Sequence, residues 1–264
     1  MPHSDPSLSS DFLRSSSLLL AVCATCLLTQ AALAQDRQPD APSWGAGIGV
    51  AAERLPYIGA GNKSIAFPAV SYEGRYFRLA GNVADVKLPG TGNWTFALRG
   101  RYALGDGYED NDAPILAGMG DRKGSFWMGA AATWNAGFAR LSLEVLGDAS
   151  GKSKGTQAGL GIERDFRAGS FVFTPRAAVA WVDRKYVDYY YGVTASEARS
   201  FRSAYRGSST VNLQAGLRTA YLIDAKQSLF VDIRATALGK EVSDSPLVGK
   251  KIVPAVAMGY LYRF

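Results

Sequence analysis

The chain has 264 residues, a formal net charge of +6, two cysteines and one histidine. His3, Cys23 and Cys26 all fall in an N-terminal segment that we expect to be removed. The mature chain would then lack the side chains for a Ser-His-Asp triad, a Cys-His pair or the usual His/Cys zinc site. We therefore expect no cofactor and no enzymatic activity. The basic excess in an exported chain favours anionic lipid headgroups or glycan-rich surfaces over nucleic acid.

The N-terminal segment has the pattern of a signal peptide. Arg14 leads into the apolar stretch SSSLLLAVCATCLLTQAALA, which ends in Ala32-Leu33-Ala34. Small residues at positions 32 and 34 fit a signal-peptidase site. The sequence predicts a signal peptide over residues 1–34 and one domain over residues 35–264, long enough for a single all-β domain.

The mature chain repeats stretches in which apolar and polar residues alternate. No stretch reaches the roughly 18 consecutive apolar residues of a membrane helix. Aromatic residues cluster at the two ends of the apolar faces, as Trp94 and Tyr102 do in NWTFALRGRYAL and Phe171 and Trp181 do in SFVFTPRAAVAW. This girdle pattern is typical of an outer-membrane β-barrel.

The connections between these stretches alternate between short and long. Counting back from the C-terminus, residues 240–251 are long, 224–226 short and 185–208 long. Outer-membrane barrels pair short periplasmic turns with long outer loops in this way. The sequence predicts an all-β, antiparallel transmembrane barrel of about ten strands. Residues 66–88 are too long for one strand, so Gly74 or Gly81 marks either a bulge or an extra pair that makes twelve.

The face opposite the apolar one carries charged residues, which we expect to point into the lumen. They are Arg99, Arg101, Arg140, Glu144, Arg176, Arg218, Asp232 and Arg234. They could form an anion-attracting constriction in a pore. Alternatively, arginines and carboxylates could fill the lumen and satisfy one another. We favour the filled lumen, because ten strands leave little open space.

The chain ends on VAMGYLYRF, in which Tyr260, Tyr262 and Phe264 share one face and Arg263 lies on the other. This spacing predicts the closing strand of the barrel, with Phe264 facing outward near Trp44. The general pattern of outer-membrane proteins implies that the barrel assembly machinery reads such an aromatic terminus. We therefore expect outer-membrane lipid and this machinery among the partners.

Several segments carry a family resemblance over most of the mature chain. They are GAGIGVAAERLPYIGAG, FPAVSYEGRYF, GMGDRKGSF, YVDYYYGVTASEA, DSPLV and the terminal GYLYRF, and they resemble the MipA/OmpV family of outer-membrane proteins. The family-motif residues in them are Pro56, Tyr57, Tyr72, Asp121, Arg122, Tyr190, Tyr191, Gly192, Asp244, Ser245 and Pro246. The resemblance implies an outer-membrane location in a Gram-negative cell.

The resemblance also implies a role. The family's namesake is a scaffold that holds a lytic transglycosylase together with a bifunctional penicillin-binding synthase. The short periplasmic turns count against this role, because they offer little surface for docking. A narrow pore for small solutes, which could include anions, is the alternative.

Overall fold

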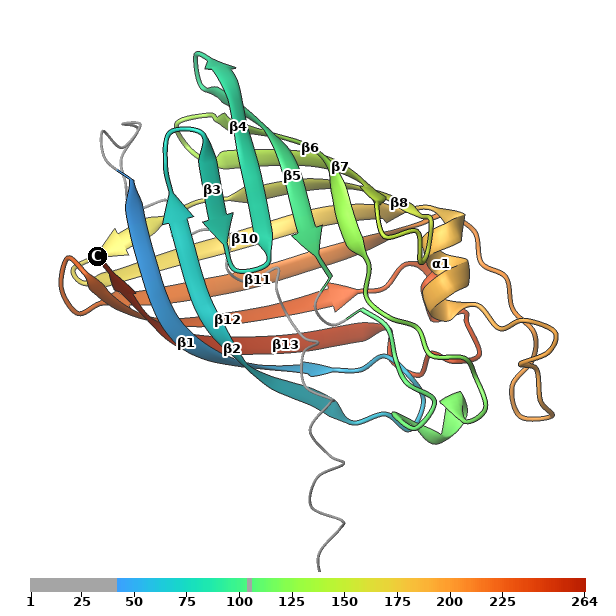
Figure 1. The fold of residues 1–264 in the computed structure, drawn as a ribbon. Helices are drawn as coiled ribbons and strands as arrows, with labels where there is room; N and C mark the ends of the chain where they lie inside the picture. The colour runs from blue at the N-terminus through green and yellow to red at the C-terminus, as the bar shows by residue number, and fades with distance from the viewer. Residues whose placement is uncertain (1–41, 104–105) are drawn as a thin grey trace, which may run out of the picture.

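The computed structural model describes residues 42–103 and 106–264, so the predicted signal peptide lies outside the described residues. The described chain is a closed antiparallel barrel of twelve strands (Figure 1). Its strands are β1 (Ser43–Arg54), β2 (Asn62–Glu73), β3 (Phe77–Ala80), β4 (Val83–Thr91), β5 (Trp94–Tyr102), β6 (Phe126–Asn135), β7 (Arg140–Asp148), β8 (Thr156–Glu163), β9 (Phe166–Ala168), β10 (Phe171–Val182), β11 (Thr210–Leu222), β12 (Gln227–Ala237) and β13 (Ile252–Arg263).

Three short helices lie in the long connections: η3 (Pro114–Leu116), α1 (Arg184–Tyr191) and α2 (Lys240–Ser243). None of the helices in the described residues is long and apolar enough to span a membrane. Each strand pairs with its neighbour in sequence, except that β8 and β9 both pair with β10, and β13 pairs with β1 to close the ring.

The two segments β8 and β9 form one barrel strand, because both pair with β10 in a single register. The break between them lies opposite Pro175. The Arg164 N–H donates to the Pro175 carbonyl at 3.3 Å, but proline has no N–H to donate in return. A missing donor, rather than a change of register, therefore interrupts this ladder.

The barrel has twelve strands, the larger of the two predicted numbers, because residues 66–88 contain an extra pair. The strand β3 runs back from β2, and a tight turn at Gly81-Asn82 leads into β4. Gly81 adopts φ +59°, in the left-handed region that glycine enters without steric cost. The premise that only ten strands enclose the lumen is therefore corrected, and the wider ring leaves more space to be filled.

Side chains on the strands alternate between an exposed outer face and a more buried inner face. Along β13, Met258 is exposed while Ala255, Ala257 and Leu261 are buried. Exposed aromatics mark both ends of the outer face, with Trp94 and Phe171 at one end and Tyr102, Phe126 and Trp181 at the other. An apolar belt between two aromatic girdles is the surface that lipid covers.

The barrel wall is incomplete beside β2. β2 pairs with β1 over its full length, but β3 covers only Ser71–Glu73 of its other edge. In the described part of the chain, that edge has no strand partner between Asn62 and Ala69 (Figure 1). The Val70 carbonyl, which points to this edge, accepts from Gly81 N at 3.0 Å. Because backbone groups alternate in direction, Pro68 also directs its nitrogen to this edge, where no donor is needed.

Candidate functional site

A chain of ion pairs crosses the lumen wall from β3 to β7. The Asp85 carboxylate, 4% exposed, accepts from Arg99 Nε at 2.8 Å and Arg99 Nη2 at 2.9 Å, and from Arg78 Nη1 at 3.2 Å. Glu144 then accepts from Arg99 Nη1 at 2.9 Å and from Arg101 Nη1 at 2.7 Å. Arg99 therefore bridges two carboxylates, one of them bidentately, which is a strong and directional arrangement.

A second ionic cluster lies on β7 to β10. Arg140 donates through Nε to Glu163 at 2.9 Å and through Nη2 to Asp165 at 3.3 Å. The Thr174 hydroxyl donates to the same Asp165 carboxylate at 2.6 Å. The β8–β9 break therefore contributes a carboxylate that holds Arg140 on the adjoining strand.

A third ionic cluster lies on β10 to β12 and extends to β1. Asp232 is fully buried and accepts from Arg176 Nη2 at 2.5 Å and from Arg218 Nε at 3.1 Å. Two residues further along β12, Arg234 donates to Glu53 at 2.7 Å. Each of the eight charged residues that the sequence placed on this face lies in one of these three clusters. Together the clusters form the charged wall of the lumen.

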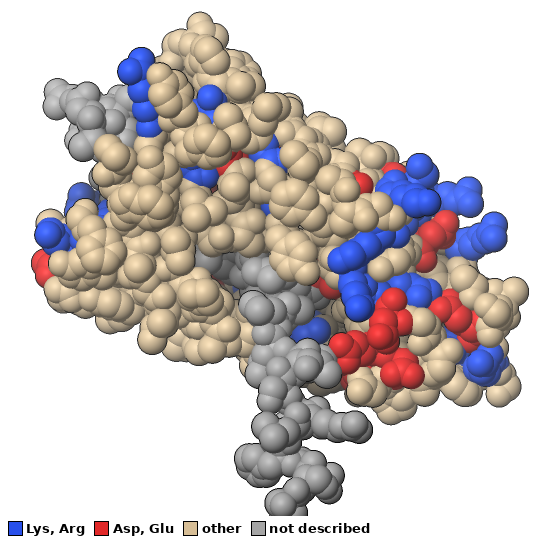
Figure 2. Space-filling model, in the orientation of Figure 1, with Lys and Arg blue, Asp and Glu red and all other residues tan. Residues whose placement is uncertain are grey.

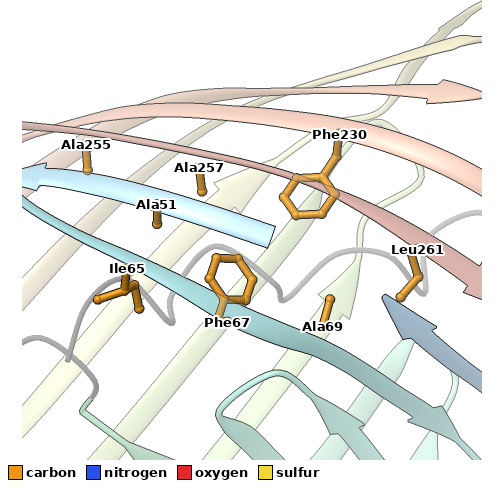
Figure 3. Packing of buried hydrophobic residues seen from close by; sticks show 8 residues of the cluster. All are labelled: Ala51, Ile65, Phe67, Ala69, Phe230, Ala255, Ala257 and Leu261. Atoms are coloured by element: carbon orange, nitrogen blue, oxygen red, sulfur yellow. The ribbon is translucent and has the colours of Figure 1, made fainter. Parts of the chain in front are cut away.

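Another part of the inner face, contributed by β1, β2, β12 and β13, carries an apolar cluster. Its buried residues are Ala51, Ile65, Phe67, Ala69, Phe230, Ala255, Ala257 and Leu261 (Figure 3), and we call this surface the apolar wall. Gly49 and Gly259 face each other on β1 and β13, with Phe67 and Phe230 beside them on the outer strands. A Cβ on Gly49 would lie 2.5 Å from Phe67 Cζ, and one on Gly259 would lie 2.8 Å from Phe230 Cε1. The two rings therefore occupy the space that these glycines leave.

The apolar wall was missed from the sequence. On β1 this surface is formed by alternate small residues, which give only a weak hydrophobic pattern in the sequence. They are Gly45, Gly47, Gly49 and Ala51. The spacing of these glycines is the feature that could have revealed it, since glycine in a strand often marks close approach of other groups.

The long connections at the end of the barrel that carries α1 pack into a cap. One buried cluster joins four of them: Tyr57, Tyr108, Ala113, Ile115, Leu116, Met119, Val193 and Leu247. A second cluster, Val182, Val187, Val242 and Val248, seats α1 and α2 on the strand ends. A connection normally lies over the surface without a core of its own. These connections share a core, so the cap is a packed layer.

Arg202 ties two of these connections together. Its guanidinium is 1% exposed, and it donates to the Ile115 carbonyl, to the Ala117 carbonyl at 3.3 Å and to the Glu197 carbonyl at 2.6 Å. This role could not be predicted from the sequence, because a single arginine in a long polar connection has no periodic pattern around it.

Arg122 makes a parallel set of contacts on the outer side of the cap. It donates to the Tyr189 carbonyl at 2.9 Å and to the Glu197 carboxylate at 2.8 Å. Burial acts to raise the pKa of Glu197, but hydrogen bonds from Thr194 and Arg122 outweigh it and hold that pKa at about 2. Glu197 is therefore a carboxylate anion at neutral pH, and it fixes the loop between α1 and β11.

On the inner side of the cap, Asp106 faces the lumen. Burial raises its pKa, while the Arg101 guanidinium acts to lower it and Glu53 acts to raise it. The Tyr186 hydroxyl donates to Asp106 at 3.4 Å. The cap therefore meets the outer end of the charged wall at this carboxylate.

Most of the family-motif residues meet in the cap. The Tyr57 hydroxyl donates to the Tyr190 carbonyl at 3.4 Å, and the Ser245 hydroxyl donates to the Tyr191 carbonyl at 2.7 Å. The Pro56 carbonyl accepts from Gly249 N at 2.9 Å.

Gly192 and Pro246 complete this group. Gly192 ends α1, and a Cβ there would lie 2.2 Å from the Asp188 carbonyl oxygen. Pro246 follows Ser245 in the turn after α2. These family-motif residues therefore form contacts that hold the cap together.

Three motif residues lie apart from this group. The Tyr72 ring packs in a tilted orientation against Trp44, with 4.4 Å between the ring centroids, at the opposite end of the barrel. Asp121 is exposed and accepts from Asp110 N at 3.3 Å. Asp244 forms an exposed ion pair with Lys240.

The C-terminal residues lie at the barrel seam. Phe264 is 73% exposed, and its N–H donates to the Trp44 carbonyl at 2.9 Å. The Tyr262 ring packs edge-on against Phe264 at 5.1 Å, and the Tyr260 hydroxyl donates to Gln227 at 2.8 Å. The terminal aromatics therefore close the ring on its lipid side. Recognition of these residues by the assembly machinery stays a prediction.

No group of three or more His, Cys, Asp and Glu residues that could hold a metal ion occurs among residues 42–103 and 106–264. The charged wall has carboxylates, but each is held by arginine.

The model of the family described as MltA-interacting protein MipA matches residues 46–264. The chain belongs to the MipA family. It is 27% identical over 231 residues to the MltA-interacting protein of Escherichia coli K12, covering 84% of this chain and 90% of that one. It is 26% identical to the outer membrane protein OmpV of Vibrio cholerae, over 72% of this chain and 71% of that one.

Two further proteins are similar to this chain. The outer membrane protein Omp26La of Vibrio anguillarum is 28% identical over 174 residues, and the match spans 64% of its length and 65% of this MipA-family chain. Among solved structures, the COG4313 outer membrane channel of Pseudomonas putida F1 superimposes with a TM-score of 0.44 and 14% identity, covering 86% of this chain and 97% of the channel.

Proposed function

We propose that this MipA-family barrel is a non-enzymatic scaffold that holds peptidoglycan-remodelling enzymes, a lytic transglycosylase and a penicillin-binding synthase, at the inner surface of the outer membrane. The observations that carry the proposal are the ion pairs along the lumen wall and the packed cap. Ion-paired arginines line the lumen, and a packed cap lies across its outer end. Such a barrel is suited to hold a position in the membrane rather than to pass solutes.

The name of the Escherichia coli relative, MltA-interacting protein, supports the transglycosylase as a partner. The docking surface must lie at the end opposite the cap. There the hairpin of β4 and β5 extends past its neighbours (Figure 1), and Trp94, directly after the turn at its tip, stacks on Trp134 at 5.6 Å. This hairpin offers more surface than the short turns led us to expect.

Co-purification tests the scaffold. The full chain, extracted from envelopes in mild detergent, should retain a lytic transglycosylase identified by mass spectrometry. Shortening the β4–β5 tip at Thr91, Gly92 and Asn93 should remove it. The matched control shortens the β11–β12 turn at Asp224–Lys226. Equal retention by both variants, or absence of any such enzyme from the native chain, would overturn the proposal.

The pore remains the second candidate, because twelve strands enclose a wider ring than the ten first expected. Planar-bilayer recording of purified protein with the Arg176→Ala variant separates the two. A filled barrel should give no steady conductance, and the variant should lose about 1–3 kcal/mol of stability, since Asp232 loses a partner. A stable variant with weakened anion selectivity would favour the pore.

A further inference from the structure

Three segments meet on the outer rim, where β6 and β8 begin and β10 ends. They are residues 120–125, residues 149–155 and the start of α1. The Lys152 Nζ donates to the Gly124 carbonyl at 2.7 Å, and the Asp183 N–H donates to the Thr156 carbonyl at 3.0 Å. A Cβ on Gly155 would lie 2.9 Å from Asp183 Oδ1, so the second segment packs directly on the helix start.

These segments carry four exposed lysines: Lys123, Lys152, Lys154 and Lys185. None of the four has a carboxylate partner in the described chain, where the lysines in ion pairs are Lys87 and Lys240. Figure 2 shows Lys and Arg side chains gathered over this end of the molecule. We call these four residues the rim lysines.

The carboxylates around the rim lysines are occupied by other groups. Asp183 caps α1 by accepting from Tyr186 N at 2.9 Å. Asp188 accepts from Arg184 Nε at 3.2 Å and from Gly207 N at 3.0 Å. The positive charge of the rim lysines is therefore left for a ligand from outside the chain.

The loop that presents two of these lysines is held rigidly. The Asp148 carboxylate accepts from Ser150 N at 2.9 Å, Ser153 N at 2.6 Å, Lys154 N at 3.0 Å and the Ser125 hydroxyl at 3.0 Å. Lys154 adopts φ +54°, in the left-handed region where glycine would fit at less cost. Lys154 therefore presents its charged side chain from a loop of fixed conformation, although its own backbone conformation is unfavourable for a residue with a side chain.

The rim lysines lie at the level of lipid headgroups. The exposed rings of Phe126, Tyr102 and Trp181 mark the outer aromatic girdle beneath them. Girdle aromatics sit at the membrane–water interface. Lys123 precedes Phe126 and Lys185 follows Trp181 by a few residues, so their ammonium groups lie just outside the girdle.

We propose that the rim lysines bind the phosphate groups of a phosphorylated glycolipid of the outer leaflet, of the lipid A class. Lysine ammoniums act on phosphate as compact point charges, and clusters of such groups next to a membrane select anionic headgroups. The acyl chains of the same lipid would lie against the apolar belt below. This site is independent of whether the barrel acts as a scaffold or a pore.

Binding of lipid A to the purified, detergent-folded full chain tests the proposal. The variant carries Lys123→Ala, Lys152→Ala, Lys154→Gly and Lys185→Ala, with glycine chosen because residue 154 has a positive φ. We expect affinity for diphosphoryl lipid A to fall about fivefold for each cation removed. We expect dephosphorylated lipid A to bind the native chain as weakly as the variant binds the diphosphoryl form.

Two controls keep the test specific. Lys250→Ala with Lys251→Ala removes exposed cations from another part of the same rim, and Lys226→Ala removes one from the opposite end. Both should bind as the native chain does, and unheated gel mobility should show that every variant is folded. The proposal would be overturned if the rim variant and the controls lost affinity for lipid A equally. It would also be overturned if the native chain bound dephosphorylated and diphosphoryl lipid A with the same affinity.

Discussion

The lumen of this barrel has two walls built on different physical principles. The charged wall fills its space with long arginine side chains held by carboxylates, as Arg99 is held by Asp85 and Glu144. The apolar wall uses alanine and glycine, with two phenylalanine rings laid over the glycines. The stability of the charged wall depends on each charge having its partner. The packing of the apolar wall depends on the side chains next to the phenylalanine rings being small.

The walls also differ in their strand pairing. β1, β12 and β13 of the apolar wall pair over most of their length, but β2 has an edge without a strand partner between Asn62 and Ala69 among the described residues. The ion pairs of the charged wall cross between neighbouring strands, as Arg99 on β5 does toward Asp85 on β4. Side-chain ion pairs therefore add to strand pairing across the charged wall, whereas the cluster of the apolar wall is held by packing and strand pairing.

The largest effect should come from removing the buried carboxylate of the charged wall. Asp232→Ala leaves Arg176 and Arg218 without their shared partner, and breaking a buried pair in this way costs about 3–5 kcal/mol. Urea unfolding in detergent, followed by tryptophan fluorescence, measures the change. Asp244→Ala, which breaks an exposed pair with Lys240, should cost no more than about 1 kcal/mol.

A compensated variant sharpens that result. Replacing the cluster by Arg176→Met, Arg218→Met and Asp232→Leu should be less destabilising than Asp232→Ala alone, because no buried charge is left unpaired. If the triple variant is the less stable of the two, ion pairing is not what organises the charged wall.

On the apolar wall, added volume should be harmful. Gly49→Val places a Cβ 2.5 Å from Phe67 Cζ, and overpacking of this kind costs about 1–3 kcal/mol. Gly147→Val on β7 is the matched control, since nothing lies within 4 Å of a Cβ there. Gel mobility across a temperature series measures both. Adding Phe67→Ala should recover part of the loss at Gly49, and failure to do so would contradict the described packing.

A smaller effect should follow from changing hydrogen-bond geometry while keeping charge. Arg99→Lys retains one cation but loses the two-pronged contact with Asp85, and we expect a loss of about 1.5 kcal/mol. Arg184→Lys, at a side chain 63% exposed, should leave the unfolding midpoint unchanged. Equal behaviour of the two variants would mean that the charged wall is solvated rather than packed.

The smallest effect should appear at the incomplete edge of β2. Pro68→Ala should change stability by no more than about 0.5 kcal/mol, because no strand of the described chain pairs with residue 68 on that edge. Ala69→Pro, whose nitrogen faces β1, should instead cost about 3 kcal/mol by removing a ladder donor. Thermal unfolding checks both, and a large loss for Pro68→Ala would mean that the edge is paired in the membrane.

The sequence by itself determined the fold class and the girdles. Alternation with a period of two fixes which residues share a face, so Trp94, Leu98 and Tyr102 could be placed outward from spacing alone. The terminal aromatics could be placed at the seam for the same reason. A local pattern of this kind depends only on neighbours along the strand.

Tertiary structure decided what depends on distant parts of the chain. The count of twelve strands depended on how the segment around Gly81 folds back, since local spacing allowed either a bulge or an extra pair. The partner of each lumen arginine depends on strand register, as Arg234 on β12 reaching Glu53 on β1 shows. The cap contacts of Arg202 and the laying of Phe67 over Gly49 join residues that share no sequence pattern. The Gly49–Phe67 contact needs the pairing of β1 with β2, and the Arg234–Glu53 pair needs the closure of the ring through β13, so each depends on how the strands assemble.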